Sequence, residues 1–281
     1  MMRAGHRTFA LIALAVVLSG TAAAQSERAH NWQRCTNAGD VHPPSVVIAG
    51  CTEVIRGRET PQNKSVALRN RAIAYRQLGD PRALEDATRI VSLEQVNRWY
   101  RIGQRGSMHL YFGDRTAAER DYQRAVDLAP EEDTDKTNRA SMFAAAGNYE
   151  AAMSGFAAAL AEEEPDDRDT VLYCRCWARV YLNRDLDLAR NDCDEALRLE
   201  ESGLTYYTRG ILGLRQGRYQ DAWNDLDAAV RFDPSDGYRR YARGFAAAGL
   251  GRANEAAEDW MAGAAREATA ARYFAALGIT P

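Results

Sequence analysis

Five cysteines are the first candidates for chemistry in this chain of 281 residues. The Cys-Arg-Cys sequence at 174–176 could support redox catalysis, but it lacks the two-residue spacing and the strand–helix context of thioredoxin-like motifs. A zinc site formed by His30, Cys35, His42 and Cys51 is a second possibility, although their spacing matches no standard zinc arrangement. Neither pattern therefore predicts a catalytic or metal centre.

Other kinds of active site have no better support. No serine, histidine and acid form a nucleophile motif, and the chain contains no glycine-rich phosphate loop. His109 is expected inside a helix, on an inner face where packed histidines are common. The acidic residues on either side of Pro165 are typical of a solvated connection. We therefore expect a protein that is not an enzyme, without catalytic residues, cofactors or metal.

Arginines recur in register along the chain, each followed at once by a very small residue. Five of the six intervals between them are 34 or 36 residues long. A fixed period in this range is typical of a solenoid, in which one supersecondary unit is stacked repeatedly. The pairs are Arg34-Cys35, Arg71-Ala72, Arg105-Gly106, Arg139-Ala140, Arg175-Cys176, Arg209-Gly210 and Arg243-Gly244.

An aspartate recurs 15 to 17 residues after five of these arginines, and Gly50 and Gly155 interrupt its column. Guanidinium and carboxylate groups form bidentate hydrogen bonds, which would fix how neighbouring helices are rotated. We interpret the pairs as structural and expect them to set register more than stability, since exposed pairs contribute only about 0–1 kcal/mol. An arginine row that recognises an acidic ligand is the alternative. The expected partners are Arg71 with Asp86, Arg105 with Asp121, Arg175 with Asp192, Arg209 with Asp225, and Arg243 with Asp259, within a repeat or between adjacent repeats.

The elements that must position these side chains are pairs of helices. A turn glycine follows eight residues after the arginine, where glycine can end a helix in the left-handed conformation. The next helix carries an alanine, a bulky residue four positions later and a small residue three beyond that, as in Ala118, Tyr122 and Ala125. This spacing places small and large residues on one helical face, so two antiparallel helices can approach closely. The turn glycines are Gly79, Gly113, Gly147, Gly217 and Gly251.

At these residues the chain resembles the tetratricopeptide repeat family. That family's 34-residue helix–turn–helix unit has small residues, a turn glycine, an aromatic and a terminal proline in the same order. The resemblance is strongest over residues 99–268, looser over 65–98 and degenerate over 28–60. It implies an all-α, right-handed superhelical solenoid that binds proteins or peptides, and it does not imply catalysis.

The repeat register also predicts two disulfides. Cys35 and Cys176 replace the small residue after an arginine, and Cys51 and Cys193 replace the bulky residue of the following helix. Each pair faces across the contact between two antiparallel helices, where a disulfide's geometry is plausible. We predict Cys35–Cys51 and Cys176–Cys193, with Cys174 as the remaining thiol.

Aromatic residues recur on the first helices, which line the concave surface in stacked hairpins of this kind. Residues two before, two after, five after and six after each arginine should point into that groove. Tyrosine and tryptophan bury large areas and are enriched in binding hot spots. Several of these rings could instead belong to the core. The candidates for ligand binding are Tyr111, Tyr173, Trp177, Tyr181, Tyr207, Tyr241 and Phe245.

The first 24 residues have the pattern of a cleaved signal peptide. Arg3, His6 and Arg7 precede the apolar run at 9–18, and the alanines at 22–24 favour cleavage between Ala24 and Gln25. Cleavage removes two arginines and no acid, which leaves 34 basic and 39 acidic residues and a formal charge of −5. That balance argues against a nucleic-acid partner. An uncleaved membrane anchor is the alternative to an exported, periplasmic protein without stable membrane insertion.

We therefore predict a signal peptide (1–24), a degenerate stapled hairpin (25–60), six tetratricopeptide-like repeats (61–268) and a closing helix within 269–281. Tyr273 and Phe274 of the closing helix are expected to cap the last repeat, as solenoids require. The first functional hypothesis is a periplasmic scaffold that binds protein or peptide segments in its groove. The second is a structural subunit that self-associates in an envelope assembly.

Overall fold

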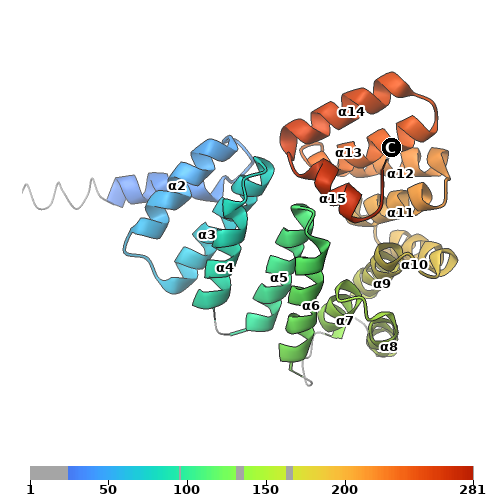
Figure 1. Ribbon diagram of the computed structural model, residues 1–281, viewed down its shortest axis with the longest axis horizontal. Coiled ribbons are helices and arrows are strands. Elements are labelled where there is room, and N and C mark those ends of the chain that lie inside the picture. The colour runs from blue at the N-terminus through green and yellow to red at the C-terminus, as the bar shows by residue number, and fades with distance from the viewer. Residues whose placement is uncertain (1–24, 95, 131–135, 163–166, 281) are drawn as a thin grey trace, which may run out of the picture. The chain divides into compact units, whose positions relative to one another are not determined.

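The computed structural model describes residues 25–94, 96–130, 136–162 and 167–280 (Figure 1). These residues form helices and their connections, with no strand among them, in agreement with the predicted all-α solenoid. The predicted signal peptide (1–24), which ends at Ala24 of the predicted cleavage site, lies outside the described residues. The acidic connection at 163–166 also lies outside them. Contacts divide the chain into two units, Met1–Ala74 and Tyr75–Pro281.

The first unit contains a stapled helical hairpin. Its described helices are residues 25–36, α2 (Pro44–Arg56) and most of α3 (Pro61–Gln77). Cys35 and Cys51 are joined by a disulfide and are fully buried. Asn70 of α3 donates a side-chain hydrogen bond to the Cys35 carbonyl at 3.1 Å. The bridge and this hydrogen bond hold the three helices together, although their other repeat features are poor.

The second unit contains five consecutive antiparallel helix pairs, preceded by α4 (Arg82–Leu93) and followed by α15 (Ala270–Ala276). The first helix of each pair continues the column of arginines, and the second carries the column of aspartates except in the second pair, where Gly155 takes its place. The pairs are α5 (Arg98–Tyr111) with α6 (Arg115–Leu128), α7 (Lys136–Ala145) with α8 (Tyr149–Leu160), α9 (Arg168–Leu182) with α10 (Leu186–Leu199), α11 (Gly203–Arg215) with α12 (Tyr219–Phe232), and α13 (Gly237–Gly249) with α14 (Ala253–Arg266).

The turns within the pairs depend on left-handed backbone. All five predicted turn glycines, four within these pairs and Gly79 between α3 and α4, have φ between 68° and 84°, a region that other residues rarely adopt. The α9–α10 turn has no glycine, and Asn183 takes the left-handed conformation there with φ 55°. Asparagine tolerates this region better than other residues with a side chain. The turn is therefore kept where the glycine column is interrupted.

Small residues allow the helices of each pair to lie close together. Ala118 and Ala125 are fully buried, and Tyr122 between them is 5% exposed. A methyl group on Gly106 would lie 3.0 Å from the Tyr122 ring. In the α11–α12 pair, a methyl group on Gly210 would lie 2.5 Å from Leu226 Cγ. The small residue after each arginine is thus a steric requirement of the pair.

We predict that Gly210→Val lowers the free energy of unfolding by about 2–3 kcal/mol, because overpacking a tight core forces side chains and backbone apart. Ala264→Val adds two methyl groups to an exposed position of α14 and should cost no more than about 0.5 kcal/mol. Urea denaturation of both variants measures the difference. Equal decreases in the free energy of unfolding would show that the α11–α12 contact has space for a larger side chain at position 210.

Candidate functional site

The predicted groove aromatics converge on the C-terminal helix α15. They come from α5, α9, α11 and α13, the first helices of four pairs. Six of the seven contact α15 or line a cavity together with its residues, although these helices and α15 lie up to about 160 positions apart in sequence. Figure 1 shows α15 running beside α13, and it also contacts α5. Six of the predicted groove residues therefore contact, or share a cavity with, a segment of the same chain.

Two adjacent aromatic residues of α15 form the centre of this contact. Tyr273 stacks on Tyr111 of α5 with ring centroids 5.1 Å apart. Phe274 is fully buried and stacks on Tyr241 of α13 at 5.6 Å and an interplanar angle of 8°. Phe245 meets the Phe274 ring edge-on at 5.4 Å. Each such ring pair adds about 0.5–1.5 kcal/mol beyond the area that it buries.

Three further predicted groove aromatics line a small cavity together with Tyr273. Trp177 and Tyr181 of α9 stack on each other at 5.0 Å. With Tyr207 of α11 they line a cavity of about 30 Å³ that Tyr273 and Leu277 close. This volume has room for about one water molecule. Little space for another ligand thus remains between these rings and α15.

Tyr173, the seventh candidate, is held by a contact with α11. Its hydroxyl hydrogen-bonds the Thr208 side chain of the neighbouring helix α11, and burial raises the pKa of Tyr173 above the ordinary value of a tyrosine. Its role as a ligand-binding residue therefore stays a prediction, as do the roles of the other six.

The N-terminal end of α15 is anchored to the last turn of α3. Glu267 forms an ion pair with Arg76 at 3.1 Å, and both side chains are largely buried. The Ala268 amide donates to the Gln77 carbonyl at 3.0 Å, and the Thr269 hydroxyl lies 2.6 Å from the Tyr238 hydroxyl. Burial raises the pKa of Glu267 to about 7, against the attraction of Arg76. Burying this carboxylate therefore has a cost that the ion pair does not fully offset.

Two arginines bind the carbonyls at the opposite end of α15. Arg215 donates to the Leu277 carbonyl at 2.9 Å, and Arg115 donates to the Ala276 carbonyl at 3.4 Å. Cationic side chains are stabilising at a helix C-terminus, because the last carbonyls have no partner within the helix. Burial, and secondarily Arg115, lowers the pKa of Arg215. Both ends of α15 are thus held by specific polar contacts.

The expected role of Tyr273 and Phe274 as a cap on the last repeat stays a prediction, and the structure adds a contact with α5. Both rings contact α13, and Tyr273 also stacks on Tyr111 of α5. The physical reason is that each ring buries a large apolar area only where other aromatics surround it. A clue was present in the sequence, since Ala270, Tyr273, Phe274 and Leu277 follow the i, i+3, i+4, i+7 spacing of a buried helical face.

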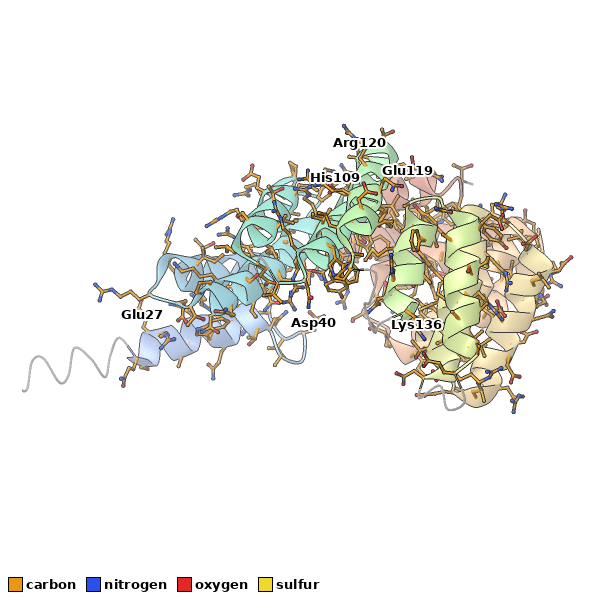
Figure 2. The ribbon with its side chains drawn as sticks, turned by 90° about the horizontal axis from the view of Figure 1, so that it is seen from below. Glu27, Asp40, His109, Glu119, Arg120 and Lys136 are labelled. Carbon is orange, nitrogen blue, oxygen red and sulfur yellow. A yellow bond between two sulfur atoms is a disulfide. The ribbon has the colours of Figure 1, made fainter. Side chains whose placement is uncertain are left out.

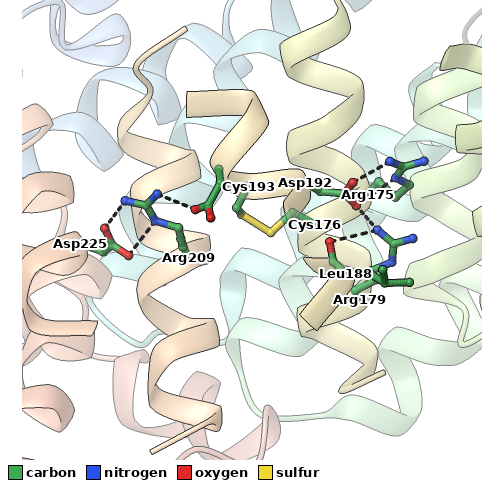
Figure 3. The surroundings of a disulfide bond; sticks show 9 residues. Arg175, Cys176, Arg179, Leu188, Asp192, Cys193, Arg209 and Asp225 are labelled. Carbon is green, nitrogen blue, oxygen red and sulfur yellow. Dashed lines mark hydrogen bonds and ion pairs between the residues drawn. A yellow bond between two sulfur atoms is a disulfide. The ribbon is translucent and has the colours of Figure 1, made fainter. Parts of the chain in front are cut away.

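The arginine and aspartate columns meet in four bidentate pairs. Each guanidinium donates through Nε and Nη2 to both carboxylate oxygens of the second helix, at distances between 2.6 and 2.9 Å (Figure 3 shows two of the pairs). The pairs are Arg105 with Asp121, Arg175 with Asp192, Arg209 with Asp225, and Arg243 with Asp259. The Arg71–Asp86 pair stays a prediction; Arg71 donates to Thr52 Oγ1 at 2.9 Å.

Two of these arginines also bridge to the preceding repeat. Arg209 Nη1 donates to Asp194 of α10 at 2.8 Å, and Arg243 Nη1 donates to Asp227 of α12 at 2.7 Å. Each of these second partners lies two residues after the aspartate column of the preceding pair. The arginine therefore connects three helices and fixes one pair of helices against the next.

The aspartates of the column are buried, so the small free energies that exposed ion pairs contribute do not apply to these pairs. Asp121, Asp192, Asp225 and Asp259 are between 5% and 7% exposed. Burial raises the pKa of Asp225 even though Arg209 opposes the shift. Removal of one partner from a buried pair typically costs about 3–5 kcal/mol, whereas replacing both by apolar residues is often neutral. That these pairs specify register more than they add net stability stays a prediction.

The disulfides follow the pairing that the repeat register predicts. Cys35–Cys51 and Cys176–Cys193 have Cα atoms 4.5 and 5.6 Å apart, within the range for a disulfide. Figure 3 shows the second bridge between α9 and α10, beside the Arg175–Asp192 pair. Cys174 lies outside both bridges. The cysteines at 35 and 51 thus bond to each other, and no zinc site is formed from them.

His109 is placed by packing and charge, with no nucleophile motif around it. Its Nε2 lies 3.9 Å from Asp121 Oδ2, and Figure 2 shows it on the same side as Glu119 and Arg120 of α6. Burial lowers the pKa of His109, against the attraction of Asp121, and so favours the neutral imidazole. Within the described part of the chain, no group of three or more histidine, cysteine or acidic side chains could hold a metal ion.

We predict that Arg209→Ala lowers the free energy of unfolding by about 3–5 kcal/mol, because it leaves Asp225 buried and unpaired. Asp225→Ala should cost less, because Arg209 keeps Asp194 as a partner. The double variant Arg209→Met, Asp225→Leu should lie within about 1 kcal/mol of the native chain. Urea denaturation measures these values, and a double-mutant cycle closed with the single variants Arg209→Met and Asp225→Leu measures the coupling. Strictly additive losses would argue against a register-setting pair.

Alkylation of the chain under denaturing, non-reducing conditions should label Cys174 alone, because the other four thiols are engaged in disulfides. Peptide mass spectrometry should then recover Cys35 with Cys51 and Cys176 with Cys193. A peptide that links Cys174 to Cys193 would contradict the pairing. After reduction, all five cysteines should be labelled, which controls for their accessibility to the reagent.

Sequence similarity connects part of this chain to one curated protein. No family model matches the chain. It is 28% identical over 155 residues to a DnaJ homolog subfamily C member 7 homolog of Schizosaccharomyces pombe, which covers 47% of the chain but only 31% of that relative. The chain thus spans about a third of the length of this curated relative.

Two solved structures are also similar to the chain. A tetratricopeptide repeat protein from Parabacteroides merdae is 20% identical, with 76% of this chain and 84% of that one covered and a TM-score of 0.44. Yeast Tom70 is 15% identical, with 83% and 58% covered and a TM-score of 0.48. The chain's own helical hairpins show that it is an α-solenoid, and in this fold it resembles tetratricopeptide repeat proteins.

Proposed function

We propose that this protein is an exported, periplasmic scaffold that is not an enzyme and binds protein or peptide segments in its aromatic groove. The observation that carries the proposal is the seating of α15 among the rings of α5 and α13. A surface that holds a short helix through aromatic side chains has the composition of a peptide-binding hot spot.

The two disulfides support the exported location. Disulfides persist in oxidising compartments such as the periplasm and are rare in the cytosol. Both bridges are fully buried at helix contacts, which places them in the core of the repeats. Among the described residues, no helix is long and apolar enough to cross a membrane. The signal-peptide pattern at 1–24 gives the route of export.

Self-association of a structural subunit is the second candidate function. Apolar side chains are exposed on the second helices of three pairs, with Leu188 of α10 49%, Phe232 of α12 51% and Met261 of α14 67% exposed. Such residues could join copies through the outer face. Light scattering between about 1 and 100 μM separates the candidates, because a self-associating subunit gains mass with concentration while a scaffold keeps its mass.

We predict that Tyr207→Ala combined with Tyr241→Ala abolishes capture of envelope proteins by the purified chain and leaves its helical circular dichroism unchanged. The matched control is Tyr206→Ala, because Tyr206 precedes Tyr207 on α11 but packs against Phe232 of α12 instead of α15. Quantitative mass spectrometry of co-purified proteins measures the effect. Equal capture by the double variant and the control would refute groove binding.

A further inference from the structure

We propose that α15 is a displaceable internal ligand of the groove, and that the partner is a helix of another protein with the same apolar stripe. This inference rests on the proposed function and names the chemistry of its partner. The groove would bind either α15 or the partner helix, so the C-terminal segment would compete with the partner.

The buried face of α15 defines the partner. Ala270, Phe274 and Leu277 are between 0% and 9% exposed, and the Tyr273 ring contacts the rings of Tyr111 and Tyr238, each with centroids 5.1 Å away. These four positions follow the i, i+3, i+4, i+7 pattern with which amphipathic helices occupy grooves. A competing helix therefore needs a small residue, two adjacent aromatics and a leucine at this spacing.

The two arginines at the end of α15 add a requirement on length. Arg115 and Arg215 donate to carbonyls within the last turn, at Ala276 and Leu277. Main-chain carbonyls are free to accept these bonds only where a helix ends. The partner helix should therefore end within one turn of its aromatic pair. Beyond this point, a cavity of about 420 Å³ beside Arg215 and Tyr219 offers space for the chain that follows.

The shortness of α15 makes displacement possible. It has seven residues, and isolated helices shorter than about 12–15 residues are marginal in water. Its order therefore depends on the groove that it fills. Its outward residues Ala271, Arg272 and Ala275 are exposed, and it belongs to no helix pair. Release of α15 leaves the arginine–aspartate pairs and the Cys176–Cys193 bridge in place, and it opens the part of the core that Ala270 and Phe274 share with α5, α9, α11 and α13.

The test uses a labelled peptide with the sequence of residues 266–281, added to the full chain. Binding is measured by fluorescence anisotropy. The variant Tyr273→Ala, Phe274→Ala weakens the internal ligand, so it should bind the peptide at least tenfold more tightly than the native chain does. The matched control Ala275→Gln changes an exposed residue of α15 and should bind as the native chain does. A peptide that carries the same two alanines should not bind.

A second variant keeps the test decisive if the first one loses its fold. Arg215→Ala removes one anchor of the last turn and leaves every aromatic ring in place. It should bind the peptide several-fold more tightly than the native chain, with unchanged helical circular dichroism. If no folded variant binds the peptide more tightly than the native chain, α15 is a permanent part of the core and the inference is wrong.

The outcomes distinguish this inference from the proposed function. If the chain captures envelope proteins through the groove but the variants do not bind the peptide, only the proposal that α15 is displaceable is wrong. If the variants bind the peptide but no envelope protein is captured, the proposal of a separate partner is wrong, and exchange of α15 between copies of this chain is favoured. Light scattering of the variant mixed with native chain would then show a rise in mass.

Discussion

The structure depends on the close approach of two antiparallel helices at a small residue. Where Gly210 meets Leu226, no space remains for even one methyl group. Because each pair repeats this contact, the helices keep a common separation and their first members line a common surface. The same positions accept a disulfide in two hairpins, as Cys176–Cys193 shows, since a small and a bulky residue face each other there. Steric fit thus sets the geometry, and covalent bonds reinforce it.

Charge fixes what steric fit leaves open, namely the rotation of one helix against the next. A bidentate pair such as Arg243–Asp259 has one favourable orientation, and its second arm to Asp227 extends the constraint to the preceding helix pair. The aspartates are buried, so a slipped register would leave a carboxylate without its cation. Such a penalty disfavours alternatives more than it stabilises the native fold. The aromatic surface is held in place by this arrangement.

Repetition explains which features could be predicted from the sequence. The turn glycines, the stripe of Ala118, Tyr122 and Ala125, the disulfide pairing and four ion pairs all follow from one period. Features that occur once could not be obtained this way. The contact of Tyr273 with Tyr111 joins residues about 160 positions apart, and no local pattern states that distance. The left-handed Asn183 likewise replaces a glycine that the period would require.

The central claim is that α15 occupies the groove as a ligand and not as part of the repeat core. Native-state hydrogen exchange of the full chain tests it most directly, because local opening and global unfolding give different protection. The account predicts that amides of α15 exchange at least tenfold faster than those of α11 and α13. Amides of α15 that exchange only together with those two helices would contradict the claim.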